Sequence, residues 1–595
     1  MLRNERKIQS GFALGRMAAA LVLTIGVHGV AMAVQTQNIG ASSWIATRTH
    51  AVNTAGATFN GNATDQEPVS IAIALKLRNE NALNNYIHEL FRRGSPSYHH
   101  FLSAKDSVAT YAPTQQQAQA VADYLTRQGF THVRIAPNRL VVSADGTVGA
   151  ARNAFRTEIA HFTRAGHSGI ANTTDIQIPA SLSGQVDHVT GLQTLNRMQT
   201  FSLQHPSYTT LNSGAAAYAP QEFATVYHAG NTPAGTGTTV ALIGWGNMTN
   251  PVNDLVQMEK SQNLAAVPTS IEPTSTDSSN DDSTQVEWGM DAQAIVGISG
   301  GVKELIFYTS GGNYVQDPKT KSWYSEGSYN SELLKAINLA VSDNKAKVIN
   351  MSWGLAECRG DAGWADSAFK LGVTQGQTFV AATGDNGAYP CEDSNHHAPA
   401  NGSYSSNTEL SVNYPASSPY VVAVGGTTLN TSASDVYNSE ASWPYSGGGI
   451  SGEESTPTWQ PSSYAHRALP DLAFDADSTN SPILIYLTQS QTANISQSGF
   501  GYAYGGTSLA APLFVGAWAR LETANKNGMG FAAPAIYSYS TTFPFHDVTT
   551  GNNGYYSAAA GWDSATGWGS FDIQAVRDFI ANTPGFVSAT NAPPN

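Results

Sequence analysis

From about Ala219 onward, the chain alternates apolar segments of strand length with segments whose apolar residues recur at helical spacing. Between the apolar segments, SELLKAINLAVSD and DAGWADSAFKLGV repeat their apolar residues about every 3.6 positions. Strands that are apolar on both faces and separated by helices predict an α/β fold with a doubly wound, mostly parallel sheet. The candidate strands are TTVALIGWG (from Thr238), KELIFYTS (from Lys303), KVINMSWG (from Lys347), TFVAATG (from Thr378) and YVVAVGGTTL (from Tyr420).

A serine lies where such a fold could present a nucleophile. The run YGGTSLAAP puts Ser508 directly after a Gly-Gly-Thr turn and at the start of a helical pattern. A hydroxyl in that position lies near backbone N–H groups and the positive end of a helix, which stabilise an oxyanion. Taken alone, however, a serine at a helix start more often only caps the helix.

A nucleophilic serine normally needs a base, and histidine is the usual choice near neutral pH. None of the fifteen histidines falls between positions 229 and 395. Instead, the segment TQVEWGMDAQAIVG carries Glu287 and Asp291, which share one face of a helix. Two carboxylates so placed repel unless they share a proton or one serves chemistry. The alternative is a capping box from Thr284 to Glu287 on a solvated acidic face.

A third carboxyl group follows a predicted strand. In VAATGDNGA, Asp385 comes directly after the apolar run TFVAA. Asp-Asn-Gly is ordinary turn chemistry, but the carboxyl ends of parallel strands are also where open sheets keep their active sites.

Together these segments resemble the sedolisins, or serine-carboxyl peptidases, which are similar to subtilisins with Glu in place of the catalytic His. The resemblance rests on EWGMD, TGDNG and GGTSLAAP, is supported by NMSWGLAE, SGGGIS and AGWDSATGWG, and covers essentially the whole chain. Gly505 stands where the family motif has serine. The resemblance implies a subtilisin-like sheet preceded by a small α+β propeptide domain.

The resemblance also implies a mechanism. Ser508 would attack the peptide carbonyl, Glu287 would transfer the proton, and Asp291 would share a proton with Glu287. Asp385, kept protonated, would donate a hydrogen bond to the oxyanion. Because a carboxyl group donates only while protonated, we expect a self-activating endopeptidase that hydrolyses proteins at acid pH.

Two other functions fit parts of the sequence. A subtilisin-type Asp-His-Ser enzyme would need one of the late histidines out of the usual order. A secreted binding protein on a degenerate peptidase scaffold would reveal itself by failing to process its own chain. For the serine-carboxyl peptidase we expect a monomer that binds no nucleic acid.

The N-terminus predicts export. Basic residues precede the apolar run MAAALVLTIGVHGVAMA, which ends in Ala-x-Ala at Ala31 to Ala33. This pattern is typical of a signal peptide whose removal leaves no membrane segment, so we expect an extracellular or periplasmic product. The expected divisions are a signal peptide (1–33), a propeptide (34–210, compact from about residue 67), a peptidase domain (211–583) and a loose tail (584–595).

Charge divides the chain in a similar way. Residues 1–205 hold 17 Lys and Arg against 11 Asp and Glu, whereas residues 206–595 hold 13 against 33. A basic leader and an acidic body attract near neutral pH and less so in acid, which predicts an inhibitory propeptide that acid releases. Alternatively, a protein that works in acid simply has few basic residues.

The leader reads as strand, helix, Ser-Pro turn, helix, hairpin and helix, and resembles the pro-kumamolisin activation domain. In its segment SPSYHHFLS, His99 and His100 are candidates to titrate near about pH 6 and aid release. Exposed turn histidines without a role are the alternative.

The two cysteines, Cys358 and Cys391, follow NMSWGLAE and TGDNG, which lie near each other in the implied fold. In an oxidising compartment a disulfide is expected, worth about 3 to 4 kcal/mol for a loop of this size. A metal pair or free thiols are the alternatives, and the lack of His at ligand spacing argues against zinc.

A calcium site is expected near the C-terminus, where a Gly/Asn-rich loop leads into SAAAGWDSATGWG. Carboxylates and backbone carbonyls held open by small residues suit a hard cation. By resemblance, the side chains of Asp547 and Asp563 and the carbonyls of Val548, Ala559 and Gly561 are its ligands. Ala559 replaces a common glycine.

Overall fold

The computed structural model describes residues 43–204, 217–275, 280–316, 321, 323–391, 409–432, 435–461 and 463–587. The predicted signal peptide and the predicted propeptide boundary at residue 210 lie outside the described residues. Within these ranges, no helix has the length and apolar character needed to span a bilayer.

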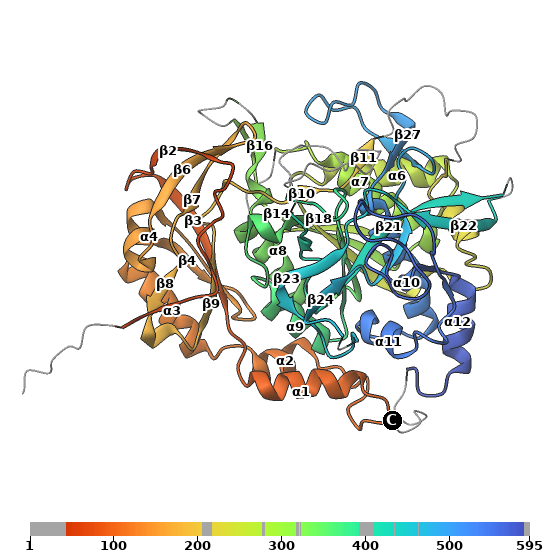
Figure 1. The fold of residues 1–595 in the computed structure, drawn as a ribbon, viewed down its shortest axis with the longest axis horizontal. Helices are drawn as coiled ribbons and strands as arrows, with labels where there is room; N and C mark the ends of the chain where they lie inside the picture. The colour runs from red at the N-terminus through yellow and green to blue at the C-terminus, as the bar shows by residue number, and fades with distance from the viewer. Residues whose placement is uncertain are drawn as a thin grey trace, which may run out of the picture. The chain divides into compact units, whose positions relative to one another are not determined.

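The predicted parallel sheet is present at the centre of the peptidase domain, drawn in yellow to cyan in Figure 1. All neighbouring strands in it are parallel except β21 and β22. The five predicted strands all occur, which confirms the α/β prediction. In spatial order the strands are β13 (Thr269–Pro273), β14 (Glu304–Ser310), β12 (Thr239–Trp245), β17 (Val348–Met351), β19 (Thr378–Ala382), β21 (Val421–Thr431) and β22 (Tyr437–Ser442), while β25 (Leu472–Asp475) also pairs with β21.

Helices cover this sheet. α7 and α10 pack against each other, and α10 lies on β17, β19, β21 and β25, whereas α8 and α9 pack against each other and on β14, β12 and β19. Every residue of β12, β17 and β19 is buried, as strands covered on both faces require. The helices are α5 (Glu222–Val226), α6 (Thr249–Ser261), α7 (Gln285–Ser299), α8 (Asn330–Asp343), α9 (Asp366–Thr374), α10 (Thr507–Ala524), α11 (Ala532–Ser538) and α12 (Ile573–Asn582).

Short strands flank the sheet. Among them, β18 follows β17 after a single residue, and β27 leads directly into α10. They are β10 (Gln199–Thr200), β11 (Leu203–Gln204), β15 (Tyr314–Gln316), β16 (Trp323–Ser325), β18 (Trp353–Ala356), β20 (Asn413–Tyr414), β23 (Gly449–Ser455), β24 (His466–Leu469), β26 (Ile483–Leu487), β27 (Gly499–Gly505), β28 (Phe545–His546) and β29 (Ser570–Phe571).

The leader forms the predicted α+β domain around a four-stranded antiparallel sheet of order β4-β5-β3-β9. One difference concerns the helix after the Ser-Pro turn, which is two helices. Pro113 excludes a helical Ala112, and Thr114 then starts α3 with a capping box. The elements are β1 (Trp44–Ala46), β2 (Thr58–Asn62), β3 (Pro68–Leu75), α1 (Glu80–Phe91), α2 (Ala104–Tyr111), α3 (Gln115–Arg127), β4 (Thr131–Ile135), β5 (Val141–Thr147), α4 (Val148–Phe155), β6 (Ile159–Arg164), β7 (His167–Asn172), β8 (Gln177–Pro179) and β9 (Val186–Thr190).

The SPSYHHFLS segment anchors the leader on the peptidase domain. Tyr98 Oη donates to Phe586 O at 2.9 Å, and Leu102 N donates to Thr374 O at 2.8 Å. Nearby, Lys370 of the peptidase domain forms a 2.9 Å ion pair with Glu80 of the leader. We call these contacts the leader anchor.

His99 lies inside the leader anchor rather than in an exposed turn. Its ring stacks on Tyr98 with centroids 4.0 Å apart and lies 5.5 Å from the ring of Phe101. Burial lowers the pKa of His99 to about 4, although backbone groups of Gly528 and Val587 partly oppose this. The expectation that His99 titrates near pH 6 in the docked leader is therefore wrong. His100 is exposed, as the alternative predicted.

The predicted disulfide is confirmed. Cys358 and Cys391 are bonded, with Cα atoms 6.0 Å apart, which joins the segment after β18 to the turn after β19. The metal-pair and free-thiol alternatives are wrong for these cysteines. The bond fixes the two loops that follow neighbouring strands of the sheet.

Candidate active site

Ser508 lies in the first turn of α10, buried, with Gly506 at the N-cap position. Its side chain does not cap the helix. The Oγ atom donates to Ser352 O at 3.2 Å and accepts from Phe201 N at 3.1 Å. The hydroxyl therefore points across the C-terminal ends of the strands, toward β18 and the leader.

Glu287 and Asp291 lie one turn apart on α7, and both are buried, with exposed fractions of 1% and 0%. The solvated acidic face is therefore not what this helix presents. The expected capping box is absent as well, because Thr284 makes no capping bond and its Oγ1 accepts from Trp288 Nε1 at 3.0 Å. Neither alternative therefore explains why two carboxyl groups are buried on one helix.

The surroundings of the pair differ between its members. Asp291 accepts from Asn350 Nδ2 at 2.9 Å and from Ser352 Oγ at 2.8 Å. Burial raises the pKa of Asp291 well above its usual range, and the charge of Glu287 adds to this. Burial also raises the pKa of Glu287, while the hydroxyls of Ser202 and Ser508 favour its charged form. Two buried carboxyl groups that influence each other in this way titrate as a pair rather than independently.

Asp385 lies in the turn after β19, facing the start of α10. Its Oδ1 accepts from Thr507 N at 2.8 Å and from Thr507 Oγ1 at 2.7 Å, and Thr507 Oγ1 in turn accepts from Gly384 N at 3.0 Å. Burial raises the pKa of Asp385 well above its usual range, and the charge of Glu287 adds to the rise. A carboxyl group fixed through Oδ1 and kept neutral can donate from its other oxygen.

The structure thus brings together all four predicted catalytic residues. Ser352 connects the two ends of the cluster, since its hydroxyl donates to Asp291 and its carbonyl accepts from Ser508. Three buried carboxyl groups with raised pKa values around one serine suit acid–base chemistry on a peptide carbonyl.

The predicted calcium ligands gather around one loop. Asp547 Oδ2 accepts from Gly561 N at 2.9 Å, and Asp563 Oδ2 accepts from Ala559 N at 2.9 Å. Asp563 is further fixed by the amides of Ala565 and Thr566. Among the described residues, no three His, Cys, Asp or Glu side chains form a group that could hold a metal ion. Two carboxylates on one loop suit a hard cation.

The chain matches known proteins over both domains. Residues 55–195 match the model of the pro-kumamolisin activation domain, and residues 319–569 match that of the subtilase family. Xanthomonalisin from Xanthomonas sp. (strain T-22) is 39% identical over 94% of this chain and 72% of that protein. Sedolisin from Pseudomonas sp. (strain 101) is 38% identical over 86% of this chain and 87% of that protein.

The chain belongs to the sedolisin family. The solved structure of Pseudomonas sedolisin, a serine-carboxyl proteinase complexed with two molecules of pseudo-iodotyrostatin, is 39% identical and has a TM-score of 0.52. The match covers 62% of this chain and 98% of the sedolisin chain in that structure. As a sedolisin-family member, the chain is a serine-carboxyl peptidase that acts on protein substrates and carries an activation domain.

Two glycines precede Ser508 in this sedolisin-family chain, and neither position has room for a side chain. A Cβ on Gly505 would overlap Ser478 N and would lie 2.6 Å from Ala476 O, so this chain has no room for a side chain there. Gly506 has a φ of 106°, and a Cβ there would overlap the carbonyl oxygen of Phe201. Among the predicted calcium ligands, Ala559 does not adopt a positive φ, so alanine fits without strain.

Sequence reasoning missed several residues of the site. Asn350, Ser352 and Thr507 lie within the motifs NMSWGLAE and GGTSLAAP, but only the fold shows which carboxyl group each one contacts. Phe201 and Ser202 come from the leader, and no motif pointed to them. They reach the site because the leader docks across it.

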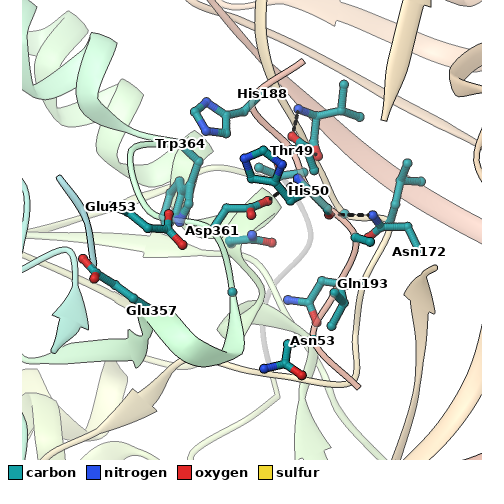
Figure 2. A pocket seen from close by; sticks show the side chains of 18 of the residues that line it. Thr49, His50, Asn53, Asn172, His188, Gln193, Glu357, Asp361, Trp364 and Glu453 are labelled. Carbon is teal, nitrogen blue, oxygen red and sulfur yellow. Dashed lines mark hydrogen bonds between the residues drawn. The ribbon is translucent and has the colours of Figure 1, made fainter. Parts of the chain in front are cut away.

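A cavity of about 210 Å³ lies between the leader and the peptidase domain, away from the four predicted catalytic residues (Figure 2). His50 and His188 of the leader line it together with Asp361 of the peptidase domain, and His50 N donates to Asp361 Oδ2 at 3.1 Å. Burial raises the pKa of Asp361 to about 6. A raised carboxyl pKa favours the docked state in acid, and this contribution is lost as the pH rises through about 6.

Proposed function

We propose that this chain is an exported, self-activating endopeptidase that hydrolyses proteins at acid pH. In this proposal Ser508 is the nucleophile, Glu287 and Asp291 transfer the proton, and Asp385 stabilises the oxyanion. The observation that carries the proposal is the burial of all three carboxyl groups around Ser508, which raises the pKa of each. Each role needs a carboxyl group with a perturbed pKa.

The proton moves through the buried pair. Glu287 takes the proton of Ser508 as Oγ attacks the carbonyl carbon, and it returns that proton to the leaving amine. Asp291, held by Asn350 and Ser352, keeps the shared proton and fixes the orientation of Glu287. Leader residues now cover Glu287, so removal of the leader lets water reach this carboxyl, which lowers its pKa toward the acid range.

The oxyanion is stabilised by a neutral acid. Thr507 donates twice to Asp385 Oδ1, and the protonated Oδ2 donates to the oxygen of the tetrahedral intermediate. An ionised Asp385 would repel that oxygen instead. Activity therefore exists below the pKa of Asp385 and is lost as the pH rises through it.

The pH profile of the mature enzyme tests the proposal. Hydrolysis of an unfolded protein is expected to peak between about pH 3 and about pH 5 and to fall as the pH rises through the raised pKa of Asp385, because the ionised carboxylate no longer donates. The measurement is the release of acid-soluble peptides across this range, with each sample returned to the optimum to confirm that inactivation is reversible. A peak at about pH 7 to 8 would contradict the mechanism.

The leader acts as an intramolecular inhibitor in this proposal, and export precedes its release. His99 supplies an acid-sensitive contact, since burial in the docked state lowers its pKa to about 4 from the usual value. Docking stability from this group is complete above about pH 6.5 and is lost as the pH falls toward about 4, where the free leader binds the proton. His99 and Asp361 therefore act in opposite directions.

We also propose one structural Ca²⁺ ion, held by the side chains of Asp547 and Asp563 and the carbonyls of Val548, Ala559 and Gly561. When bound, the ion supplies positive charge that links the loop after β28 to the segment before β29. The residues themselves bring the two carboxylates to one turn, through Gly561 N and Ala559 N.

Chelation tests this site. Removing Ca²⁺ from the full chain at about pH 5.5 is expected to lower the Tm by roughly 3 to 8 °C, because a bound ion stabilises only the folded state. Added Ca²⁺ should restore the Tm in the wild type but not in Asp563→Asn, whereas the exposed control Asp578→Asn should respond like the wild type. A Tm that is indifferent to both chelator and Ca²⁺ would rule out the ion.

A further inference from the structure

The last described stretch of the leader, residues 199–204, crosses the candidate active site between two edges of the peptidase domain. On one side, Gln199 and Thr200 pair antiparallel with Gly354 and Trp353 of β18. On the other side, residues 203–204 pair antiparallel with residues 504–505 of β27. An extended segment paired on both sides is how a sheet edge holds a peptide.

The peptide group between Phe201 and Ser202 lies beside the predicted catalytic side chains. A Cβ added to Gly506 would overlap the carbonyl oxygen of Phe201 and would lie 2.6 Å from Asp385 Oδ2, so the two oxygens share one side of this glycine. Phe201 N donates to Ser508 Oγ at 3.1 Å. The backbone of Ser202 faces Glu287.

Neighbouring bonds of the leader are placed differently. Thr200 is paired with Trp353 in one ladder, and Leu203 is paired with Gly505 in the other. Only the bond from Phe201 to Ser202 has both of its residues outside the ladders. Its carbonyl faces the oxyanion donor and its amide faces the proton-transfer group, as hydrolysis requires.

The side chain of Phe201 is 5% exposed and belongs to the hydrophobic core cluster of the peptidase domain. Cβ atoms added to Gly354 and Gly384 would lie 3.2 Å and 3.5 Å from its ring. The two glycines therefore leave the room that an aromatic side chain fills. Burial of such a side chain supplies binding energy at the residue before the cleaved bond.

We infer that Phe201–Ser202 is the bond that the chain cuts in itself, and that its protein substrates carry a bulky apolar residue before the cleaved bond. This inference rests on the proposed function. Ser508 Oγ forms a bond to the carbonyl carbon of Phe201 while Glu287 takes the hydroxyl proton, and the C–N bond breaks as Glu287 protonates the amine of Ser202. Water then hydrolyses the ester, leaving a carboxyl group on Phe201 and restoring the Ser508 hydroxyl.

Intact-mass analysis of both fragments tests the inference. The chain without residues 1–33 is brought to about pH 4 and sampled at low conversion, before further trimming. The leader fragment is expected to end at Phe201 and its partner fragment to begin at Ser202. Ser202→Pro, which removes the amide hydrogen and alters the leaving group, is expected to abolish this cut, whereas the control Thr210→Pro leaves it unchanged.

Substitutions of Phe201 test the pocket assignment separately from the position of the cut. Phe201→Ala is expected to slow the first cut roughly 10- to 100-fold, and Phe201→Leu is expected to restore most of the rate. Equal rates for both variants would overturn the pocket assignment.

The outcomes separate the inference from the proposed function. A first cut at any other bond, still abolished by Ser508→Ala, would overturn the inference and leave the proposed function intact. If the wild type makes no cut at all under these conditions, or if Ser508→Ala cuts as fast as the wild type, both are overturned.

Discussion

The Ser508→Ala zymogen is expected to stay intact at about pH 4, where the wild type loses its leader. The Oγ atom is the group that attacks, and its loss leaves three carboxyl groups without a nucleophile to activate. We expect the first-order rate of self-cleavage to fall by on the order of 10⁵- to 10⁶-fold. The measurement is the intact mass of both proteins, followed over time at several protein concentrations.

Thr523→Ala is a matched control for this substitution. It removes a hydroxyl from the far end of the same helix, where Thr523 bonds to Thr238 and accepts from Gly237 N. It should cost about 1 kcal/mol of stability and leave the cleavage rate within about twofold. If the wild type and Ser508→Ala both remain whole, the chain is either a non-catalytic relative, as the binding-protein alternative holds, or a zymogen that needs a partner protease.

Two substitutions of Asp385 that remove the same charge are expected to differ in their rates of self-cleavage. Asp385→Ala loses the donor and should slow self-cleavage by about 10²- to 10³-fold. Asp385→Asn keeps an oxygen that can accept from Thr507 N and Oγ1, and it presents an NH₂ group that donates at every pH. It should stay within about tenfold of the wild type at about pH 4.

The pH dependence of self-cleavage distinguishes these roles further. In the wild type, the rate is expected to fall as the pH rises through the raised pKa of Asp385. Asp385→Asn has no such group, so its rate should persist to higher pH. If Asp385→Asn is as slow as Asp385→Ala at every pH, Asp385 does not act as a donor. Circular dichroism of each zymogen controls for misfolding.

Much of the fold was predictable because its signals are local. The five predicted central strands each contain an apolar run that is buried, and each lies where the sequence predicts. The helix that was predicted to begin at Asp361 begins only at Asp366. Trp364 lies in the loop before it, because its ring packs on that of Tyr414. Such boundaries depend on tertiary packing, which local periodicity does not encode.

The candidate site was predictable in part. Its four predicted residues lie in short motifs that stay contiguous in sequence, so resemblance could find them. The contacts that fix their protonation could not be found in this way, because Asn350 and Ser352 lie in a motif of their own and contact Asp291 on α7 only in the folded chain. Whether Glu287 and Asp291 were solvated or buried depended on how α7 packs against α10 and α6.

The docked leader has a consequence for the timing of activation. Hydrolysis of one bond leaves both new ends paired, one with β18 and the other with β27, while the leader anchor through Tyr98 and Leu102 stays intact. A nicked zymogen is therefore still a blocked enzyme, in which the leader persists as a bound product. Peptidase activity should appear only after a lag behind chain cleavage, and the length of that lag reports how fast the leader departs.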